Sequence, residues 1–199
     1  IIGRNGSVKT TLINALSGIL GIDGGVVVVE ESEKLSKIKP HEVPSLGITR
    51  TFQTIRLFEQ MTVLDNILVV LTERQVFKAI FDKHTDYHLK IAEEILDKVN
   101  LWGKRNDLAV NLSYGQRKLL EIARVLAMDV NIYLLDEPFA GLFPEMAKII
   151  SGIIKELKQQ GKTIVLIEHD MGLIRELSDH VFVMDSGKLL AEGKPEEVL

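Results

Sequence analysis

The sequence predicts an α/β fold with a mostly parallel central sheet, and three observations support this prediction. Two short apolar runs, Ile132–Leu135 and Thr163–Ile167, each end in acidic residues, as is typical of strands buried on both faces of a parallel sheet. Strand patterns and helical patterns alternate along the chain without internal repeats. A glycine-containing loop near the first residue joins an apolar stub to a helical pattern, which favours a nucleotide-binding architecture.

Length and composition are those of one globular domain. The chain has 199 residues, of which 46% are hydrophobic and 26% are charged. The net charge is −4 without a basic block, so nothing favours sequence-independent binding to nucleic acid. The absence of cysteine excludes disulfides and thiolate metal sites, and no run reaches the roughly 18 apolar residues of a membrane span.

The loop from Gly3 to Thr11 has the pattern of a P-loop, which predicts a P-loop NTPase. In such a loop, backbone N–H groups cradle phosphates, Lys9 reaches the β- and γ-phosphates, and the Thr10 hydroxyl binds Mg²⁺. The pattern G-x-x-x-x-G-K-[ST] has glycine where this chain has Val8, and a β-branched residue suits a positive φ poorly. A turn that only leads into a helix is the alternative.

The remaining elements follow from apolar spacing and from breakers. In chain order we expect a helix at 12–16, a turn at 21–25, a strand at 26–29, a charged surface connection at 30–45 and a strand-like run at 47–53. After the central region we expect a helix at 145–160 stopped by Gly161, a helix at 171–178, a strand at 181–184, a turn at 185–188, a strand at 189–191 and a helix opening at Pro195.

Residues 62–110 are predicted to form a mostly helical insert. Thr62 is expected to cap its first helix, and apolar residues recur at helical spacing over 86–101. The insert either presents a surface to a partner or only covers the sheet. His84 and His88 have the spacing of a metal-binding pair, but without a third ligand they are expected to be exposed histidines.

A second predicted anion site precedes the helix at 117–128. It combines a serine cap, a glycine and the N–H groups of a helix N-terminus, in the run Ser113-Tyr114-Gly115-Gln116. Two phosphate-binding helix ends in one chain suggest that each nucleotide touches both ends, one from each of two copies of the protein.

Polar side chains end the two apolar strands. Asp136 and Glu137 cannot point the same way, because strand side chains alternate, so one can hold a cation while the other orients or deprotonates a water. The alternative is a strand that ends in two solvated acids. His169 follows the second strand at the edge where open α/β sheets bind ligands, which favours a functional over a purely structural histidine.

The order of these motifs resembles the nucleotide-binding subunit of ABC transporters. The local sequences around Gln53, Gly115 and Glu137 are similar to those of the branched-chain amino-acid (Liv-type) importers. The resemblance implies a single nucleotide-binding domain with an ATPase core at 1–61 and 111–199 and a helical subdomain at 62–110.

The resemblance also implies a role for each motif. Thr10, Gln53 and Asp136 complete the Mg²⁺ shell, Glu137 is the general base, and His169 holds the γ-phosphate and the water. The residues implied to bind the ATP phosphates are Gly3, Arg4, Asn5, Gly6, Ser7, Val8, Lys9, Thr10 and Thr11. Those implied to bind the ATP of the opposite subunit are Ser113, Tyr114, Gly115 and Gln116.

The function implied is ATP hydrolysis, with ATP and Mg²⁺ as cofactors, that powers uptake of branched-chain or related amino acids. The implied partners are membrane-embedded permease subunits, a second ATP-binding subunit in a head-to-tail dimer and, indirectly, an extracytoplasmic solute-binding protein. The implied location is the cytoplasmic face of the cell membrane. One alternative is the ATPase of another ABC system, such as lipopolysaccharide export; another is a catalytically impaired docking module.

Because the sequence departs from the family pattern at several positions, the docking module remains an alternative. Val8 replaces the P-loop glycine, Arg4 the usual proline and Phe143 a usually polar residue. Val8 is expected to crowd the phosphate and weaken ATP binding. The first residue is expected to lie midway along the strand that feeds the P-loop, so the chain is expected to be N-terminally truncated and to lack the family's opening strands and adenine-stacking aromatic residue.

Overall fold

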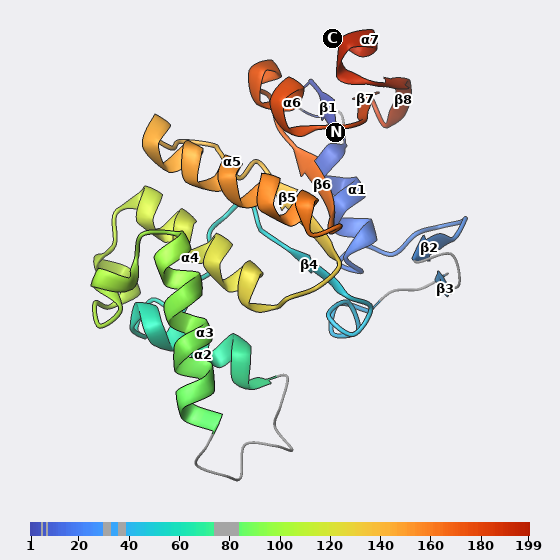
Figure 1. Ribbon diagram of the computed structural model, residues 1–199. Coiled ribbons are helices and arrows are strands. Elements are labelled where there is room, and N and C mark those ends of the chain that lie inside the picture. Colours follow the sequence, from blue (N-terminus) through green and yellow to red (C-terminus); the bar gives the residue numbers. More distant parts are fainter. Residues whose placement is uncertain (5, 7, 30–32, 36–38, 74–83) are drawn as a thin grey trace. The chain divides into compact units, whose positions relative to one another are not determined.

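The structure is a computed structural model that describes residues 1–4, 6, 8–29, 33–35, 39–73 and 84–199 (Figure 1). The chain forms two compact units. The first comprises Ile1–Arg50, Val130–Pro138 and Leu157–Leu199, and the second comprises Thr51–Asp129 and Phe139–Glu156. The predicted helical segment at 62–110 falls within the second unit, and its status as a subdomain stays a prediction.

Parallel strands form the centre of the first unit. β4 (Ile48–Arg50), β5 (Ile132–Asp136) and β6 (Thr163–Ile167) pair in parallel in that spatial order. Asp136 lies opposite Ile167, so β5 and β6 end at the same level of the sheet. The apolar runs predicted as buried strands are therefore adjacent, and the predicted α/β class is confirmed.

A second sheet in the same unit carries the strand that feeds the P-loop. β1 (Ile2–Gly3) pairs in parallel with β7 (Val181–Asp185), which turns back into antiparallel β8 (Lys188–Gly193). The amino group of Ile1 donates a hydrogen bond to the carbonyl oxygen of Leu166 near the end of β6. The glycine loop therefore starts at Gly3, only two residues after a direct contact with the end of the central strand β6.

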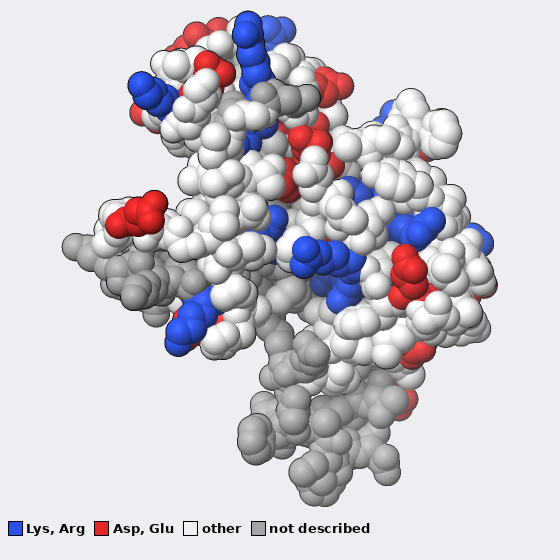
Figure 2. Space-filling model, turned by 180° about the vertical axis from the view of Figure 1, so that it is seen from behind, with Lys and Arg blue, Asp and Glu red and all other residues white. Residues whose placement is uncertain are grey.

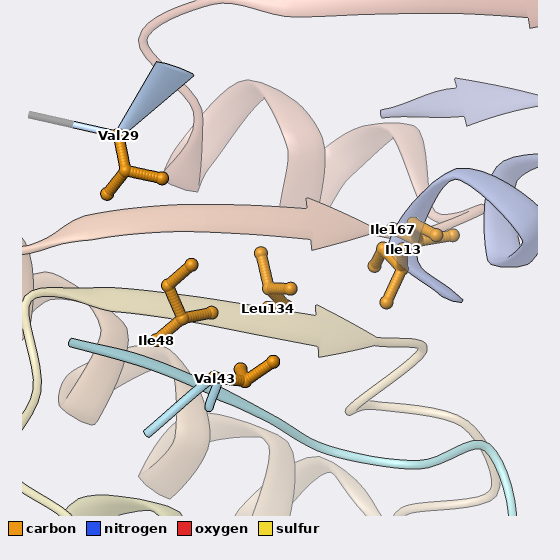
Figure 3. Close-up of a cluster of buried hydrophobic side chains, with 6 residues drawn as sticks. All are labelled: Ile13, Val29, Val43, Ile48, Leu134 and Ile167. Carbon is orange, nitrogen blue, oxygen red and sulfur yellow. The ribbon is translucent and has the colours of Figure 1, made fainter. Parts of the chain in front are cut away.

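Apolar packing fixes α1 (Lys9–Leu16) against the central strands (Figure 3). Ile13 of α1 belongs to one buried cluster with Leu134 of β5 and Ile167 of β6, and its other buried members are Val29, Val43 and Ile48. Because residues two apart on a strand share a face, Asp136 lies on the same face of β5 as Leu134. The core thus directs Asp136 toward the layer that contains α1.

Helices dominate the second unit. α2 (Val63–Glu73), α3 (His84–Lys98) and α4 (Tyr114–Ala127) pack against one another in pairs, and the short helices η1 (Trp102–Lys104) and η2 (Ala109–Asn111) connect α3 to α4. The Oγ1 atom of Thr62 accepts a hydrogen bond of 3.0 Å from the backbone N–H of Asp65, which confirms the predicted cap.

The expectation of two exposed histidines is wrong for His88. This side chain is only 7% exposed, because it lies on the same stripe of α3 as the buried residues Ala92, Ile95, Leu96 and Val99. Its ring lies 5.8 Å from the ring of Tyr87. The side chain of His84 lies outside the described part of the chain, so the metal-pair spacing receives no support from the structure.

Local differences from the predicted elements have physical causes. The stretch at 30–45 is not only a connection, because β3 (Glu33–Leu35) pairs antiparallel with β2 (Val27–Val29). α1 and α4 each begin three residues before the predicted start, at Lys9 and Tyr114. In both cases the helical conformation begins directly after the N-cap residue, which is Val8 for α1 and Ser113 for α4.

The helices after β5 end or begin at recognisable caps. After α5 (Pro144–Gln159), Gly161 adopts φ +75° and its N–H donates to the Lys158 carbonyl at 3.0 Å, while the Lys162 N–H donates to the Leu157 carbonyl at 3.0 Å. This pair of bonds is a Schellman motif, and it confirms the predicted glycine stop. The remaining helices are α6 (Met171–Leu177) and α7 (Pro195–Val198).

Charged side chains of both signs are interspersed over the face drawn in Figure 2. Among the described residues, none of the helices has the length and apolar character needed to cross a lipid bilayer.

The Schellman motif predicts opposite effects of alanine at two glycines. Gly161→Ala should lower the free energy of unfolding by about 1 kcal/mol, because alanine is strained at positive φ. Gly152→Ala should raise it by up to about 1 kcal/mol, because Gly152 lies inside α5 with open space around a new Cβ. Urea denaturation measures both, and a change of the same sign in the two variants would contradict the assignment.

Candidate functional site

The P-loop lysine is folded over its own loop. The Nζ atom of Lys9 donates to the carbonyl oxygens of Gly3 at 2.7 Å and Arg4 at 2.9 Å, and the residue is only 6% exposed. Gly6 adopts φ +83°, a conformation that glycine adopts without strain. Asn5 and Ser7 lie outside the described residues. The lysine amine is therefore held by the two carbonyl groups at the start of the loop, where it can contact an anion.

The start of α1 provides the N–H groups that such an anion needs. The helical ladder begins with the Leu12 N–H, which donates to the Val8 carbonyl at 3.0 Å. The N–H groups of Thr10 and Thr11 precede that bond, at the positive end of the helix dipole. Thr10 is partly buried and Thr11 is exposed, so the two hydroxyls have different surroundings.

Val8 adopts the strained conformation that its position in the motif predicts. Its backbone is left-handed, with φ 70° and ψ 18°, and it caps α1 without a side-chain hydrogen bond. Such a conformation costs a residue with a Cβ roughly 1–2 kcal/mol. One γ-methyl of Val8 lies 3.8 Å from where a Cβ on Gly187 would be, so this methyl faces the β7–β8 turn.

The two acids at the end of β5 have different environments. Asp136 is fully buried, whereas the Glu137 side chain is 23% exposed. Glu137 leaves the strand with φ +48°, and its N–H donates to the Ile167 carbonyl at 3.0 Å. The alternative of two solvated acids is therefore wrong.

Glu137 and His169 are brought together by the adjacent ends of β5 and β6. The Nε2 atom of His169 lies 2.8 Å from Oε1 of Glu137. The backbone N–H of His169 donates to the buried carboxylate of Glu168 at 3.1 Å. Asp170 caps α6 by accepting from the N–H of Gly172 at 2.8 Å. These bonds hold the histidine backbone while its ring, 41% exposed, remains open to a ligand.

The predicted second anion site lies in the second unit and is an ordered helix start. Ser113 and Gln116 form a capping box, in which the Gln116 N–H donates to Oγ of Ser113 at 3.3 Å and the Ser113 N–H donates to Oε1 of Gln116 at 3.0 Å. A Cβ on Gly115 would lie 2.2 Å from Sδ of Met146 in α5. Tyr114 is half exposed, and its hydroxyl lies 3.5 Å from the Ala140 carbonyl oxygen. A side chain at position 115 would force Met146 to move, so close packing favours glycine there independently of any anion.

Gln53 also lies in the second unit, with an exposed side chain. The N–H of its neighbour Phe52 donates to Oε1 of Glu121 in α4 at 3.3 Å, and Glu121 forms a buried ion pair of 3.1 Å with Lys118. Sequence reasoning missed this pair. The sequence carried a signal for it: Glu121 interrupts the apolar run Leu119–Ala123, and Lys118 directly precedes that run.

The donor set in the first unit suits Mg²⁺. The Thr10 hydroxyl and the buried Asp136 carboxylate are hard oxygen donors, and Mg²⁺ characteristically keeps several waters beside one or two such ligands. No group of three or more His, Cys, Asp or Glu side chains poised for a metal occurs within the described ranges.

Comparison with known proteins identifies the family. A family model described as ABC transporter matches residues 1–140. The chain belongs to the ABC transporter family. The probable branched-chain amino acid transport ATP-binding protein LivG of Archaeoglobus fulgidus is 38% identical over 209 residues, which cover 100% of this chain and 79% of that protein. The chain is thus an ABC ATP-binding subunit homologous to those of branched-chain amino-acid importers.

Solved structures agree with the family. A nucleotide-free ATP-binding cassette from an ABC transporter has a TM-score of 0.81 at 36% identity and covers 98% of this chain and 79% of its own. A dimeric post-hydrolysis cassette bound to ADP and Pi has a TM-score of 0.83 at 26% identity, covering 98% and 83%. The predicted P-loop NTPase fold is confirmed. Cassettes of this family bind ATP and ADP, and ATP hydrolysis coupled to transport is typical of them.

The strain at Val8 predicts that glycine stabilises the chain at this position. Val8→Gly should raise the free energy of unfolding by about 1 kcal/mol, because the left-handed backbone ceases to be strained. Val28→Gly is the matched control, because Val28 is an exposed valine in β2, where glycine should destabilise. Urea denaturation of both variants checks this, and equal destabilisation by the two changes would contradict it.

Proposed function

We propose that this chain hydrolyses ATP to power uptake of branched-chain or related amino acids. The observation that carries the proposal is the 2.8 Å contact between Glu137 and His169 at the ends of β5 and β6. The same unit contains the P-loop, where Lys9 is bonded to the carbonyl oxygen of Gly3. Phosphoryl transfer requires positioning and charge neutralisation more than covalent chemistry, and these residues supply both.

The phosphates would bind to the loop and to the first turn of α1. Lys9 exchanges its bonds to loop carbonyls for bonds to phosphate oxygens, while N–H groups at the helix start donate to the same ligand. The residues assigned to this role are Gly3, Arg4, Asn5, Gly6, Ser7, Val8, Lys9, Thr10 and Thr11. Thr10, Gln53 and Asp136 are assigned to the Mg²⁺ shell, with Asp136 acting through water. When bound, the ion neutralises charge on the β- and γ-phosphates.

Glu137 is assigned as the general base for the attacking water, and His169 as the donor that holds the γ-phosphate and that water. A partly exposed carboxylate can reach a water, and the imidazole beside it limits its rotation. Because Nε2 of His169 lies 2.8 Å from Oε1 of Glu137, a water that enters the site must share or replace that contact.

The Ser113–Gln116 segment is assigned to the ATP held by an opposite ATP-binding subunit, which makes a head-to-tail dimer with two nucleotides. An ordered helix start with an exposed serine is suited to an anion from outside the chain. The 62–110 subdomain is assigned to membrane-embedded permease subunits at the cytoplasmic face of the membrane, and an extracytoplasmic solute-binding protein acts through them.

The β-branched side chain of Val8, which stands where the P-loop pattern has glycine, favours a second candidate, a docking module that does not turn over ATP. Crowding of the phosphate by Val8 would give Val8→Gly a lower nucleotide dissociation constant than the original chain. Isothermal titration with ATP analogues measures both constants, and equal values would contradict crowding. Co-purification of the membrane subunits identifies the transport system and separates amino-acid uptake from another ABC system.

Removal of the general base should abolish turnover without abolishing binding. Glu137→Gln keeps the size of the side chain but cannot accept a proton, so ATP hydrolysis should fall at least about 100-fold. Release of radiolabelled phosphate measures turnover, and equilibrium dialysis measures retained nucleotide. The assay uses the full chain with its membrane subunits.

Glu192→Gln is the matched control, because Glu192 is an exposed acid on β8 and should not affect turnover. Unchanged hydrolysis in Glu137→Gln would refute the assigned base. An original chain without turnover, together with no nucleotide retained by Glu137→Gln, would leave only the docking module.

A further inference from the structure

We infer that Glu121, held by Lys118, is a positioning residue that fixes the backbone before Gln53, and that α4 thereby orients the Mg²⁺ ligand assigned to Gln53. The inference rests on the proposed function for the roles of Gln53 and of the segment that begins at Ser113. The positioning itself rests on contacts within the second unit.

The central contact joins a loop backbone to a buried carboxylate. Oε1 of Glu121 accepts from the Phe52 N–H at 3.3 Å, and Oε2 of the same carboxylate lies 3.1 Å from Nζ of Lys118. One oxygen therefore holds the loop while the other holds the cation. Because Phe52 directly precedes Gln53, this bond restricts the direction in which the exposed amide leaves the chain.

The Lys118–Glu121 pair is too deeply buried to be explained only by a contribution to the stability of α4. The side chains of Lys118 and Glu121 are only 1% and 6% exposed. Removing two charges from water is costly, and apolar residues of similar volume stabilise a helix face at least as well. A buried charged acceptor is, however, a strong partner for a backbone N–H. The pair thus has the properties expected of a fixed anchor for the Phe52 N–H.

A second contact one turn along α4 holds the same loop. Arg124 donates from Nη1 to the carbonyl oxygen of Arg56, and its guanidinium lies 4.8 Å from the centre of the Phe58 ring. The guanidinium of Arg56 lies 3.9 Å from the centre of the Phe52 ring. Residues 52–58 are therefore fastened to α4 at both ends of the segment.

The same helix starts at the capping box of Ser113. Glu121 follows Ser113 by eight residues, which is about 12 Å along a helix. The capping box and the acceptor of the Phe52 N–H therefore belong to one continuous helix. α4 connects the segment assigned to the opposite subunit's ATP with the residue assigned to Mg²⁺.

Two double variants separate anchoring from stability. Lys118→Met with Glu121→Gln removes both charges but keeps an oxygen for the Phe52 N–H, whereas Lys118→Met with Glu121→Met removes the oxygen as well. Both variants have the same net charge, and neither leaves a buried unpaired ion. Lys98→Met with Glu156→Gln removes an exposed ion pair of the same unit and is the control.

Hydrogen exchange at the Phe52 amide is the first measurement, and it does not depend on turnover. We expect exchange at least about tenfold faster in the Met/Met variant than in the Met/Gln variant, with global unfolding measured in parallel by urea. Equal exchange in the two variants, or equal acceleration in the exposed-pair control, would overturn the anchor.

The Mg²⁺ concentration that half-saturates ATP hydrolysis by the complex with membrane subunits is the second measurement. We expect it to rise about tenfold in the Met/Met variant and to be largely restored in the Met/Gln variant, as for other groups that orient a metal ligand. Altered exchange with unchanged Mg²⁺ dependence would overturn the link to Gln53. An original chain without turnover would refute the proposed function, and the exchange result would still decide the anchor.

Discussion

The register of β5 against β6 is the constraint on which the site depends. Pairing of Asp136 with Ile167 brings the residues after both strands to one level, and the Glu137 N–H extends the ladder by donating to the Ile167 carbonyl. His169 then reaches Glu137 at 2.8 Å. A slip by one residue would turn every side chain of a strand to its other face and would remove Asp136 from the face that carries Leu134. Core packing therefore specifies the site geometry.

Backbone strain is concentrated at two positions of the candidate site. Five described residues other than glycine have positive φ, and three of them are Asn100, Asp129 and Ser186, which have short polar side chains. Val8 and Glu137 are the others, with φ 70° and 48°. Each such conformation costs roughly 1–3 kcal/mol and persists only where the surroundings enforce it. The helix start after Val8 and the bond from the Glu137 N–H provide that enforcement.

Features with local causes were predictable from the sequence, and features with tertiary causes were not. The buried strands, the Thr62 and Ser113 caps and the Gly161 stop each follow from residues within one turn or strand. The burial of His88 depends on what packs against α3. The pairing of β3 depends on its partner strand β2, which the composition of residues 33–35 does not reveal.

The residues of the candidate site fall into the same two groups, those predictable from the sequence and those that depend on tertiary contacts. Motif order predicted Lys9, Asp136, Glu137 and His169 as site residues, and of these the structure brings Glu137 and His169 into contact. Contacts between elements distant in sequence were not predictable: Met146 against Gly115, Glu121 against the Phe52 N–H, and the methyl of Val8 against Gly187. Motifs predict the candidate reacting groups, whereas the residues that hold those groups in place are determined by packing.

Val8 shows why stability and affinity must be considered separately at a substituted P-loop. Its left-handed backbone is already present before any phosphate contact is made, so the strain lowers the stability of the fold. Strain common to the free and bound states cancels in a dissociation constant, which responds only to differences between those states. Affinity therefore suffers only through methyl groups that must move when phosphate binds. One γ-methyl already faces the β7–β8 turn. The strain of the Val8 backbone therefore lowers the free energy of unfolding, whereas the side chain changes the dissociation constant only if its other atoms crowd the phosphate.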